Sequence, residues 1–313
     1  MSSVRVGFIG LGIMGRPMAS NLLKAGFGVV AHSRTHSKVE ALVALGAEAG
    51  TSARDVAGRC DVVITMVPDT PDVQLVMLGP DGVIEGAHDG LIAIDMSTIS
   101  PTATREIAAA LATRGVRMLD APVSGGEAGA IAGSLSIMVG GDEAVFTRCQ
   151  PVFAAMGTRV TYIGPQGHGQ ITKLCNQVVG VLTLEAVAEG LTLATKAGVD
   201  VRRVIDAISG GAADSWMLRN QAPRMVQRDF APGFFIHLQQ KDLRLVMELA
   251  GTLSAPLPGA ALVHQLFSAV EATGGAALGT QALVLALERL AGLESQMQQI
   301  SGTTKVTKAT KKD

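Results

Sequence analysis

Short apolar runs alternate with amphipathic segments through the first half of the chain. The run at residues 4–9 ends in a glycine-rich turn, after which Met18, Leu22 and Leu23 recur at helical spacing. This order predicts a strand, a tight turn and a helix. The alternation continues to residue 163, with further strands predicted at 29–32, 62–67, 91–95, 116–120, 136–139 and 159–163 and further helices at 38–45, 101–114 and 143–156.

Runs as apolar as residues 62–67 are typical of parallel strands that are buried on both faces of a sheet. Repeated units of strand and helix build a doubly wound sheet with right-handed crossovers. We therefore predict an α/β Rossmann-type domain over residues 1–163.

A much longer apolar segment begins after residue 167. It predicts a helix from His168 to Thr195, about 28 residues at roughly 1.5 Å each. Valine, leucine and alanine occur nearly all round this helix, which a surface helix would not show. We expect residues 164–197 to form an interdomain helix that is covered on several sides, either by the chain's own domains or by a second copy of the chain.

The strand signals cease after this helix. Helical periodicity recurs at 201–208, 216–226, 238–250, 260–272 and 280–290, which predicts an all-helical C-terminal domain over residues 198–295 for substrate binding and oligomerisation. Residues 301–313 hold four lysines among threonines and almost nothing apolar, so we expect a disordered basic tail over 296–313.

Composition narrows the class of protein. Hydrophobic residues make up 48% of the 313 residues and charged residues 17%, which is ample material for two folded domains. Lys and Arg number 26 against 27 acids, so the charge balance predicts neither a nucleic-acid surface nor a polyacidic partner, and a small molecule is the expected ligand. The three cysteines show no paired spacing, and neither a signal peptide nor an uncharged membrane-length run is seen, so we expect a cytoplasmic protein.

The first turn carries a dinucleotide-binding fingerprint. Gly10, Gly12 and Gly15, with Leu11, Ile13 and Met14 between them, follow a predicted strand and open a predicted helix. In that context the first glycine permits the tight turn, the second lets a pyrophosphate approach the backbone, and the third brings helix against strand. The helix N-terminus adds N–H groups and the positive end of its dipole. A plain turn would not need three glycines.

The end of the second predicted strand bears on the choice of cofactor. An acid at this place would bind the ribose 2′-hydroxyl of NAD, but the chain carries Ser33, Arg34 and Thr35 after His32. The Arg34 guanidinium and the two hydroxyls suit a 2′-phosphate, which favours NADP, with NAD possible. The alternative is that Arg34 is an ordinary solvated arginine.

Two further segments carry candidate chemistry. Ser124, Gly125 and Gly126 follow a strand's carboxyl end and could turn backbone N–H groups towards a substrate carboxylate, although a purely structural turn would look the same. Lys173 and Asn176 share one face of the first turns of the long helix, where Lys173 is a candidate acid/base and Asn176 could orient it or bind substrate. Metal-ligand spacing is missing among the six histidines, so we expect no metal.

Together these segments resemble the β-hydroxyacid dehydrogenase (3-hydroxyisobutyrate dehydrogenase-like) family over residues 4–293. Its four signatures occur in order at 7–19, 120–126, 167–176 and 241–243. The resemblance implies that Lys173 is the catalytic acid/base and that the segment from Ser124 to Gly126 holds the substrate carboxylate. It also implies cofactor contacts from Met66, Val67, Pro68, Thr98 and Lys241.

Two positions depart from the family pattern. Gln177 stands where many members carry a second asparagine, and the second strand ends without an acid. The resemblance implies a reversible, nicotinamide-dependent reduction of a small semialdehyde acid to a β-hydroxyacid, with oxidation of 3-hydroxyisobutyrate or a related 3-hydroxyacid as the alternative. The choice of NADP rests on Arg34, and the apolar long helix predicts a homodimer or homotetramer. A different class stays open, namely a non-catalytic dinucleotide-binding and oligomerisation module, and the presence of Lys173 and Asn176 counts against it.

Overall fold

The computed structural model describes residues 4–293, and these residues form two compact units. The first, called here the sheet unit, comprises the chain up to Asn176 together with Arg244–Leu253. The second, the helical unit, comprises Gln177–Leu243 and the chain from Ser254 onward. The predicted boundaries at residues 163 and 197 stay a prediction, because the structure divides the long helix itself between the two units. The predicted basic tail at 296–313 lies outside the described residues.

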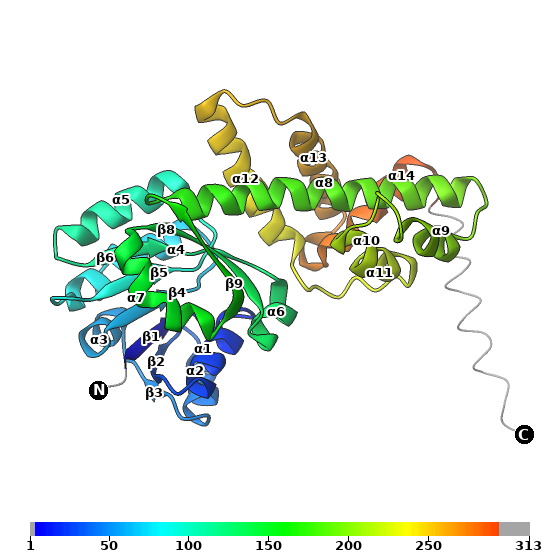
Figure 1. Ribbon diagram of the computed structural model, residues 1–313. Helices are drawn as coiled ribbons and strands as arrows, with labels where there is room; N and C mark the ends of the chain where they lie inside the picture. The colour runs from blue at the N-terminus through cyan, green and yellow to red at the C-terminus, as the bar shows by residue number, and fades with distance from the viewer. Residues whose placement is uncertain (1–3, 294–313) are drawn as a thin grey trace, which may run out of the picture. The chain divides into compact units, whose positions relative to one another are not determined.

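The sheet unit is built on one nine-stranded sheet in the order β3-β2-β1-β4-β5-β6-β8-β7, with β9 paired to β8 (Figure 1). The chain passes from β1 outward to β2 and β3 and then returns to place β4 on the other side of β1. The strands are β1 Arg5–Ile9, β2 Gly28–His32, β3 Glu48–Ala49, β4 Val62–Thr65, β5 Ile92–Asp95, β6 Arg117–Asp120, β7 Val123–Ser124, β8 Leu135–Gly141 and β9 Gly157–Gly164. The predicted doubly wound sheet is confirmed, and its strand order reverses between β1 and β4, where such sheets bind ligands.

One part of the sheet is not parallel. Strand β8 runs antiparallel to β6 and β7, whereas β1 to β6 are mutually parallel. The prediction of parallel strands is therefore wrong at this end. After β6 the chain makes β7, a turn in which Gly125 and Gly126 both have positive φ, and the short helix α6 Gly126–Ala132. Because β7 pairs antiparallel with β8, this connection folds back as a wide hairpin and does not cross over a face of the sheet.

Helices cover both faces of the sheet (Figure 1). Successive strand residues alternate between the two cores, so Phe8 and Ile64 pack on one side while Ile9 and Val63 pack on the other. This is why the strands are continuous apolar runs. The helices are α1 Gly15–Lys24, α2 His36–Val43, α3 Ala53–Arg59, α4 Thr70–Leu78, α5 Pro101–Ala112, α6 and α7 Glu143–Ala154, with the 3-10 turn η1 Val83–Gly86. Five short elements, β3, α3, α4, β7 and α6, were not predicted from the sequence pattern.

Helix α8, His168–Lys196, has 29 residues and begins in the sheet unit and ends in the helical unit. Its length and apolarity would also suit a membrane span. However, Val181, Leu184 and Leu191 belong to the core of the helical unit, and Glu185 is buried with them. Helix α8 is therefore a helix of the folded chain and not a membrane span.

The helical unit confirms the predicted all-α second domain. Its core gathers Leu184, Ile236, Val263 and Phe267 from three helices. The predicted helix at 216–226 is two helices, because Pro223 stands at the start of a new one. Besides α8, the elements are α9 Val201–Ile208, α10 Trp216–Asn220, α11 Ala222–Val226, α12 Ile236–Leu253, α13 Pro258–Ala272, η2 Gly275–Ala277, η3 Thr280–Leu283 and α14 Val284–Leu290, where α12 also contributes its last turns to the sheet unit.

Candidate active site

The glycine turn between β1 and α1 leaves room for a ligand at one glycine only. A Cβ atom on Gly10, which has φ 101°, would lie 2.3 Å from the Met66 carbonyl oxygen, and one on Gly15 would lie 1.9 Å from the Gly10 carbonyl oxygen. A Cβ on Gly12 would meet nothing within 4 Å. Gly10 and Gly15 are thus required by packing, whereas Gly12 faces open space in which a pyrophosphate could approach the backbone.

The rest of this turn also fits an anion. Leu11 is buried beneath it, whereas Ile13 is 45% exposed and Met14 partly so. Helix α1 has no side-chain cap at Met14 and no acid in its first turn. Its N-terminal N–H groups and the positive end of its dipole can therefore act on a bound phosphate.

The segment after β2, residues 33–35, contains the cation Arg34 and no acidic residue. Arg34 is 80% exposed in its side chain, and its Nη1 lies 3.4 Å from Oδ1 of Asp72 in α4. The Thr35 N–H donates to Oγ of Ser33, and helix α2 begins directly after, at His36. The three residues combine a helix N-terminus, hydroxyl groups and a guanidinium, which is a suitable set for a phosphate. Asp72 therefore competes with a bound phosphate for the Arg34 guanidinium, and nothing in the sequence pattern indicated this ion pair.

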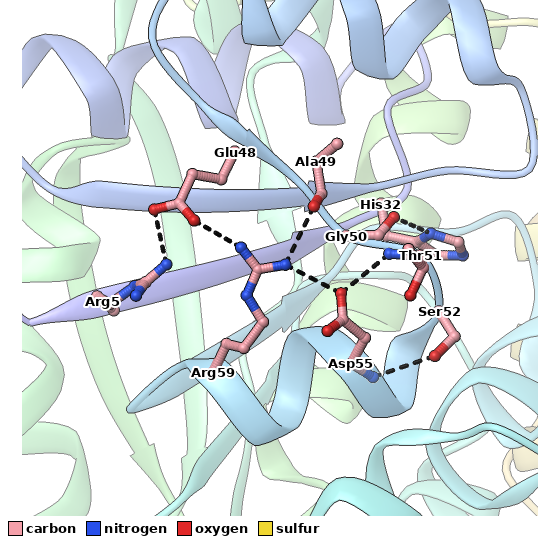
Figure 2. Close-up of polar contacts among 9 residues, drawn as sticks. All are labelled: Arg5, His32, Glu48, Ala49, Gly50, Thr51, Ser52, Asp55 and Arg59. Carbon is pink, nitrogen blue, oxygen red and sulfur yellow. Dashed lines mark hydrogen bonds and ion pairs between the residues drawn. The ribbon is translucent and has the colours of Figure 1, made fainter.

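A polar network between α3 and residues 48–51 holds the segment that pairs with β2 (Figure 2). Arg59 donates to Glu48, to Asp55 and to the Ala49 carbonyl oxygen. The Arg59 hydrogen bond holds the pKa of Glu48 below its usual range, and the Thr51 N–H does the same for Asp55. In Figure 2 the ring of His32 points to this network, with Nδ1 3.0 Å from the Gly50 carbonyl oxygen. The last residue of β2, just before Ser33, is thereby held by the neighbouring loop.

Hydrogen bonds join the carboxyl ends of β4 and β5. The N–H of Val67 donates to Oγ of Ser97, and Oγ1 of Thr65 donates to Oδ1 of the fully buried Asp95. Burial raises the pKa of Asp95 to about 6. Met66 is also tied to β1, since its N–H donates to the Ile9 carbonyl oxygen. The segments holding Met66, Val67, Pro68 and Thr98 are therefore positioned together beside the glycine turn.

Asp120, the last residue of β6, binds the start of α8. Its Oδ1 accepts from the Gly167 N–H at 2.7 Å and from Nε2 of Gln166 at 2.9 Å, and its Oδ2 accepts from the Gln170 N–H at 2.9 Å. Burial raises the pKa of Asp120, and the backbone hydrogen bonds act in the opposite direction. The carboxylate thus caps a helix that belongs to a distant part of the sequence.

Close backbone contact reinforces this junction. A Cβ on Gly169 would lie 2.4 Å from the Met138 carbonyl oxygen and 2.6 Å from that of Asp120. The side chain of Gln170 is fully buried and bonds the loop after β5, where its Oε1 accepts from the Ile99 N–H and its Nε2 donates to the Ser97 carbonyl oxygen. The first turn of α8 is therefore fixed to the carboxyl edge of the sheet.

Lys173 follows Gln170 by three residues on the same side of α8. Its side chain is buried, with 7% relative exposure, and Asn176 is half-buried one turn further on. Both residues belong to the sheet unit. Lysine side chains are usually exposed to solvent, so a buried lysine in the first two turns of a helix is unusual. Such a position suits a group that exchanges protons with a substrate.

The predicted substrate turn lies in the same unit. Ser124 ends β7 and is half-buried, and Gly125 and Gly126 have φ of 140° and 61°. Side chains other than glycine are strained at such angles. The turn can therefore expose backbone donors that a larger residue would cover.

Lys241 belongs to the helical unit, unlike the other predicted site residues. Its Nζ lies 2.7 Å from Oδ1 of the buried Asp242, whose Oδ2 accepts from Nε2 of Gln177. Gln177, at the position that departs from the family pattern, thus shares a carboxylate with the late lysine. Within residues 4–293, no cluster of three or more His, Cys, Asp or Glu side chains could hold a metal ion.

Sequence reasoning missed the residues that assemble this site. Asp120 opens the second family signature and directly follows a buried strand, and Gln170 stands three residues before Lys173. These positions were the available signals. The sequence does not indicate which distant backbone groups an aspartate or a glutamine will bind. The partners of Asp120 and Gln170 are therefore seen only in the folded chain.

Two family models match the chain, and several known proteins are similar to it. Residues 5–164 match the family described as the NAD binding domain of 6-phosphogluconate dehydrogenase, and residues 167–287 match that described as NAD-binding of NADP-dependent 3-hydroxyisobutyrate dehydrogenase. The chain is 46% identical to 2-hydroxy-3-oxopropionate reductase of Escherichia coli over 92% of this chain and 98% of that protein. It is 39% identical to the NAD-dependent L-serine dehydrogenase of Pseudomonas aeruginosa over 84% of this chain and 91% of that protein. A solved structure of Mycobacterium tuberculosis 3-hydroxyisobutyrate dehydrogenase with L-serine superposes with a TM-score of 0.84, at 34% identity, covering 91% of this chain and 99% of that one.

Proposed function

Because this chain belongs to the 3-hydroxyisobutyrate dehydrogenase-like family of β-hydroxyacid dehydrogenases, we propose that it reduces a small semialdehyde acid reversibly to a β-hydroxyacid with NADPH. Its membership makes it an NAD(P)-dependent oxidoreductase that acts on CH–OH groups. Tartronate semialdehyde, with glycerate as the product, is the first candidate substrate, as the name of the Escherichia coli relative implies. Oxidation of 3-hydroxyisobutyrate or a related 3-hydroxyacid is the alternative.

The burial of Lys173 carries the proposal. Its side chain is 7% exposed at the start of a helix that Asp120 fixes to the carboxyl edge of the sheet. When a carbonyl carbon receives hydride, negative charge develops on its oxygen and must be neutralised by an acid. Lys173 gives that proton in reduction and takes it back in oxidation, and Asn176 on the same helix face orients it.

The other residues bind and orient. Gly10, Gly12 and Gly15, with Leu11, Ile13 and Met14, hold the pyrophosphate against the start of α1, while Met66, Val67, Pro68, Thr98 and Lys241 complete the cofactor contacts. The nicotinamide supplies or accepts the hydride. The turn at Ser124, Gly125 and Gly126 binds the substrate carboxylate through N–H groups and a hydroxyl. A carboxylate fixed there sets the distance from the reacting carbon to Lys173, which is how positioning raises the rate.

NADP preference rests on the segment after β2. Arg34 is exposed, has Ser33 and Thr35 as neighbours and follows a strand that ends without an acid, and its ion pair is with Asp72 of α4. One matched family is described as NADP-dependent, while the Pseudomonas aeruginosa relative is named as NAD-dependent, so relatives of both kinds exist. Arg34 is therefore the residue on which we base the choice.

A panel of small semialdehyde acids and their hydroxyacids tests the proposal. The purified protein should oxidise NADPH fastest with tartronate semialdehyde, with slower turnover of the semialdehyde of 3-hydroxyisobutyrate. Amides or esters of the substrate should react poorly, because they lack the carboxylate. If no member of the panel supports turnover while cofactor still binds, the non-catalytic dinucleotide-binding module becomes the better proposal.

The remaining proposals concern location and assembly. We place the enzyme in the cytoplasm, with no nucleic-acid or membrane partner, because its charge is nearly balanced and it uses no paired cysteines. We also propose a homodimer or homotetramer, because α8 exposes apolar side chains such as Val179 and Leu193.

A further inference from the structure

We propose that Gln170 is a positioning residue which fixes the candidate acid Lys173 and the cofactor loop around Thr98 as one rigid assembly. The inference rests on the proposed function and goes beyond it, because it assigns a role to a residue that touches neither substrate nor cofactor. It follows from the geometry at the junction between α8 and the sheet.

The side chain of Gln170 bridges two backbone groups on either side of Thr98. Its Oε1 accepts from the Ile99 N–H at 3.1 Å, and its Nε2 donates to the Ser97 carbonyl oxygen at 2.8 Å. Both amide ends are thus used on residues that flank Thr98, and Gln170 itself has no exposed surface. A buried amide that is hydrogen-bonded at both its oxygen and its nitrogen has one orientation. It therefore holds α8 at a fixed position relative to residues 97–99.

The backbone of the same residue connects to a second strand. The Gln170 N–H donates to Oδ2 of Asp120, whose Oδ1 accepts from the Gly167 N–H. Ser97 in turn accepts from the Val67 N–H through Oγ. Gln170 therefore joins the ends of β4, β5 and β6 to the first turn of α8, and Lys173 lies one turn later on the same face.

This arrangement has a mechanistic consequence. Hydride and proton must reach the carbonyl carbon and oxygen of one substrate, so the cofactor loop and Lys173 have to keep a constant separation. A displacement of about 1 Å at such a site costs roughly 100-fold in rate. A bridge from the helix of Lys173 to both neighbours of Thr98 holds that separation directly.

Two variants separate this role from a merely structural one. Gln170→Leu keeps the volume and removes both hydrogen bonds, so kcat should fall about 10- to 100-fold, while the KM for the semialdehyde changes far less. Gln170→Glu keeps an oxygen that accepts from the Ile99 N–H. Its other carboxylate oxygen, when ionised, is an acceptor that faces the Ser97 carbonyl oxygen, so this hydrogen bond is lost. Protonation turns that oxygen into a donor, so the activity of Gln170→Glu relative to wild type should recover as the pH falls from about 8 to about 5.5.

A matched control lies at the opposite end of the sheet. Nε2 of His88 is 3.0 Å from the Cys60 carbonyl oxygen, just before β4 begins. His88→Phe also removes a side-chain bond to the backbone, and it should lower thermal stability while leaving kcat unchanged. A kcat for Gln170→Leu within about threefold of wild type, far short of the loss expected from misplacement, overturns the inference, as does a Gln170→Glu ratio that does not vary with pH.

Hydrogen exchange tests the bridge without turnover. The Ile99 amide should lose protection in Gln170→Leu and keep it in Gln170→Glu, because only the glutamate retains the acceptor. Unchanged exchange in Gln170→Leu contradicts the inference even if the enzyme is active. A wild-type protein with the expected exchange pattern but no turnover on the panel counts against the proposed function alone.

Discussion

At the scale of single residues, Lys173 is the group whose loss should matter most. Lys173→Ala should lower kcat by about 10²- to 10⁴-fold, the usual range for a positioned acid, without weakening cofactor binding. Lys173→Arg should be nearly as inactive, because a guanidinium does not release its proton. Steady-state kinetics with NADPH binding measured by fluorescence checks both. If a Lys173 variant keeps more than about a tenth of the wild-type rate, another group must donate the proton, and Lys241 would be tested next.

Arg34 should decide between the two nicotinamide cofactors. Arg34→Asp should weaken NADPH roughly ten- to more than a hundredfold relative to NADH, the value of a charge-assisted contact to phosphate. Asp72→Asn should act in the opposite direction by a few-fold at most, because it releases Arg34 from an exposed ion pair. Arg114→Asp, at another exposed arginine, is the charge control. A wild-type enzyme that prefers NADH several-fold would show that Arg34 has been misinterpreted.

At the scale of elements, the carboxyl ends of adjacent parallel strands gather two buried acids. Asp95 ends β5 and is paired in register with Asp120 at the end of β6. Burial raises the pKa of Asp95 to about 6 from 3.8. Between these values the folded chain holds a proton that the unfolded chain has lost, so this group's contribution to stability falls as the pH rises through that window and stays lower above it.

Asp95→Asn should therefore gain stability relative to wild type as the pH rises from about 4 to about 7, by up to about 3 kcal/mol. The amide keeps the oxygen that accepts from Thr65 and Ser97. Urea unfolding of both proteins across this range measures the difference. Asp206→Asn, on an exposed helix face, is the control and should show no such trend. A constant difference between Asp95→Asn and wild type at every pH would contradict the argument.

At the scale of the whole molecule, α8 leaves apolar surface uncovered. Only 28% of its most apolar 18-residue stretch is buried within the chain, and Val179 and Leu193 are 66% and 71% exposed. Val179, Ala186 and Leu193 recur every seven residues and are all exposed, which gives one apolar stripe. A second copy of the chain is the simplest cover for such a stripe.

The combined variant Val179→Lys, Leu193→Lys should therefore shift the protein to smaller species in light scattering at micromolar concentration. Wild type should show no monomer. Leu45→Lys changes an equally exposed leucine in the sheet unit and should leave the assembly state unchanged. A wild-type protein that is a stable and active monomer would refute the predicted assembly.

The sequence by itself determined the parts of this protein that depend on local pattern. Strands buried on both faces are continuous apolar runs, so β1, β4 and β5 were predictable, as was the long helix α8. The glycine turn was predictable too, because three glycines at this spacing between a strand and a helix are typical of a dinucleotide-binding turn. Short elements such as β3 and α6 were not, since a few residues carry too little periodicity to distinguish helix from strand.

Only the tertiary structure decided which distant groups meet. The reversal of β8, the capping of α8 by Asp120 and the bridge from Gln170 to both neighbours of Thr98 join residues that lie 20 to 73 positions apart. The hydrogen bonds of a buried aspartate or glutamine follow from its surroundings and not from its neighbours in sequence. The sequence could therefore identify Lys173 as the candidate acid, whereas the groups that hold its helix became visible only in the folded chain.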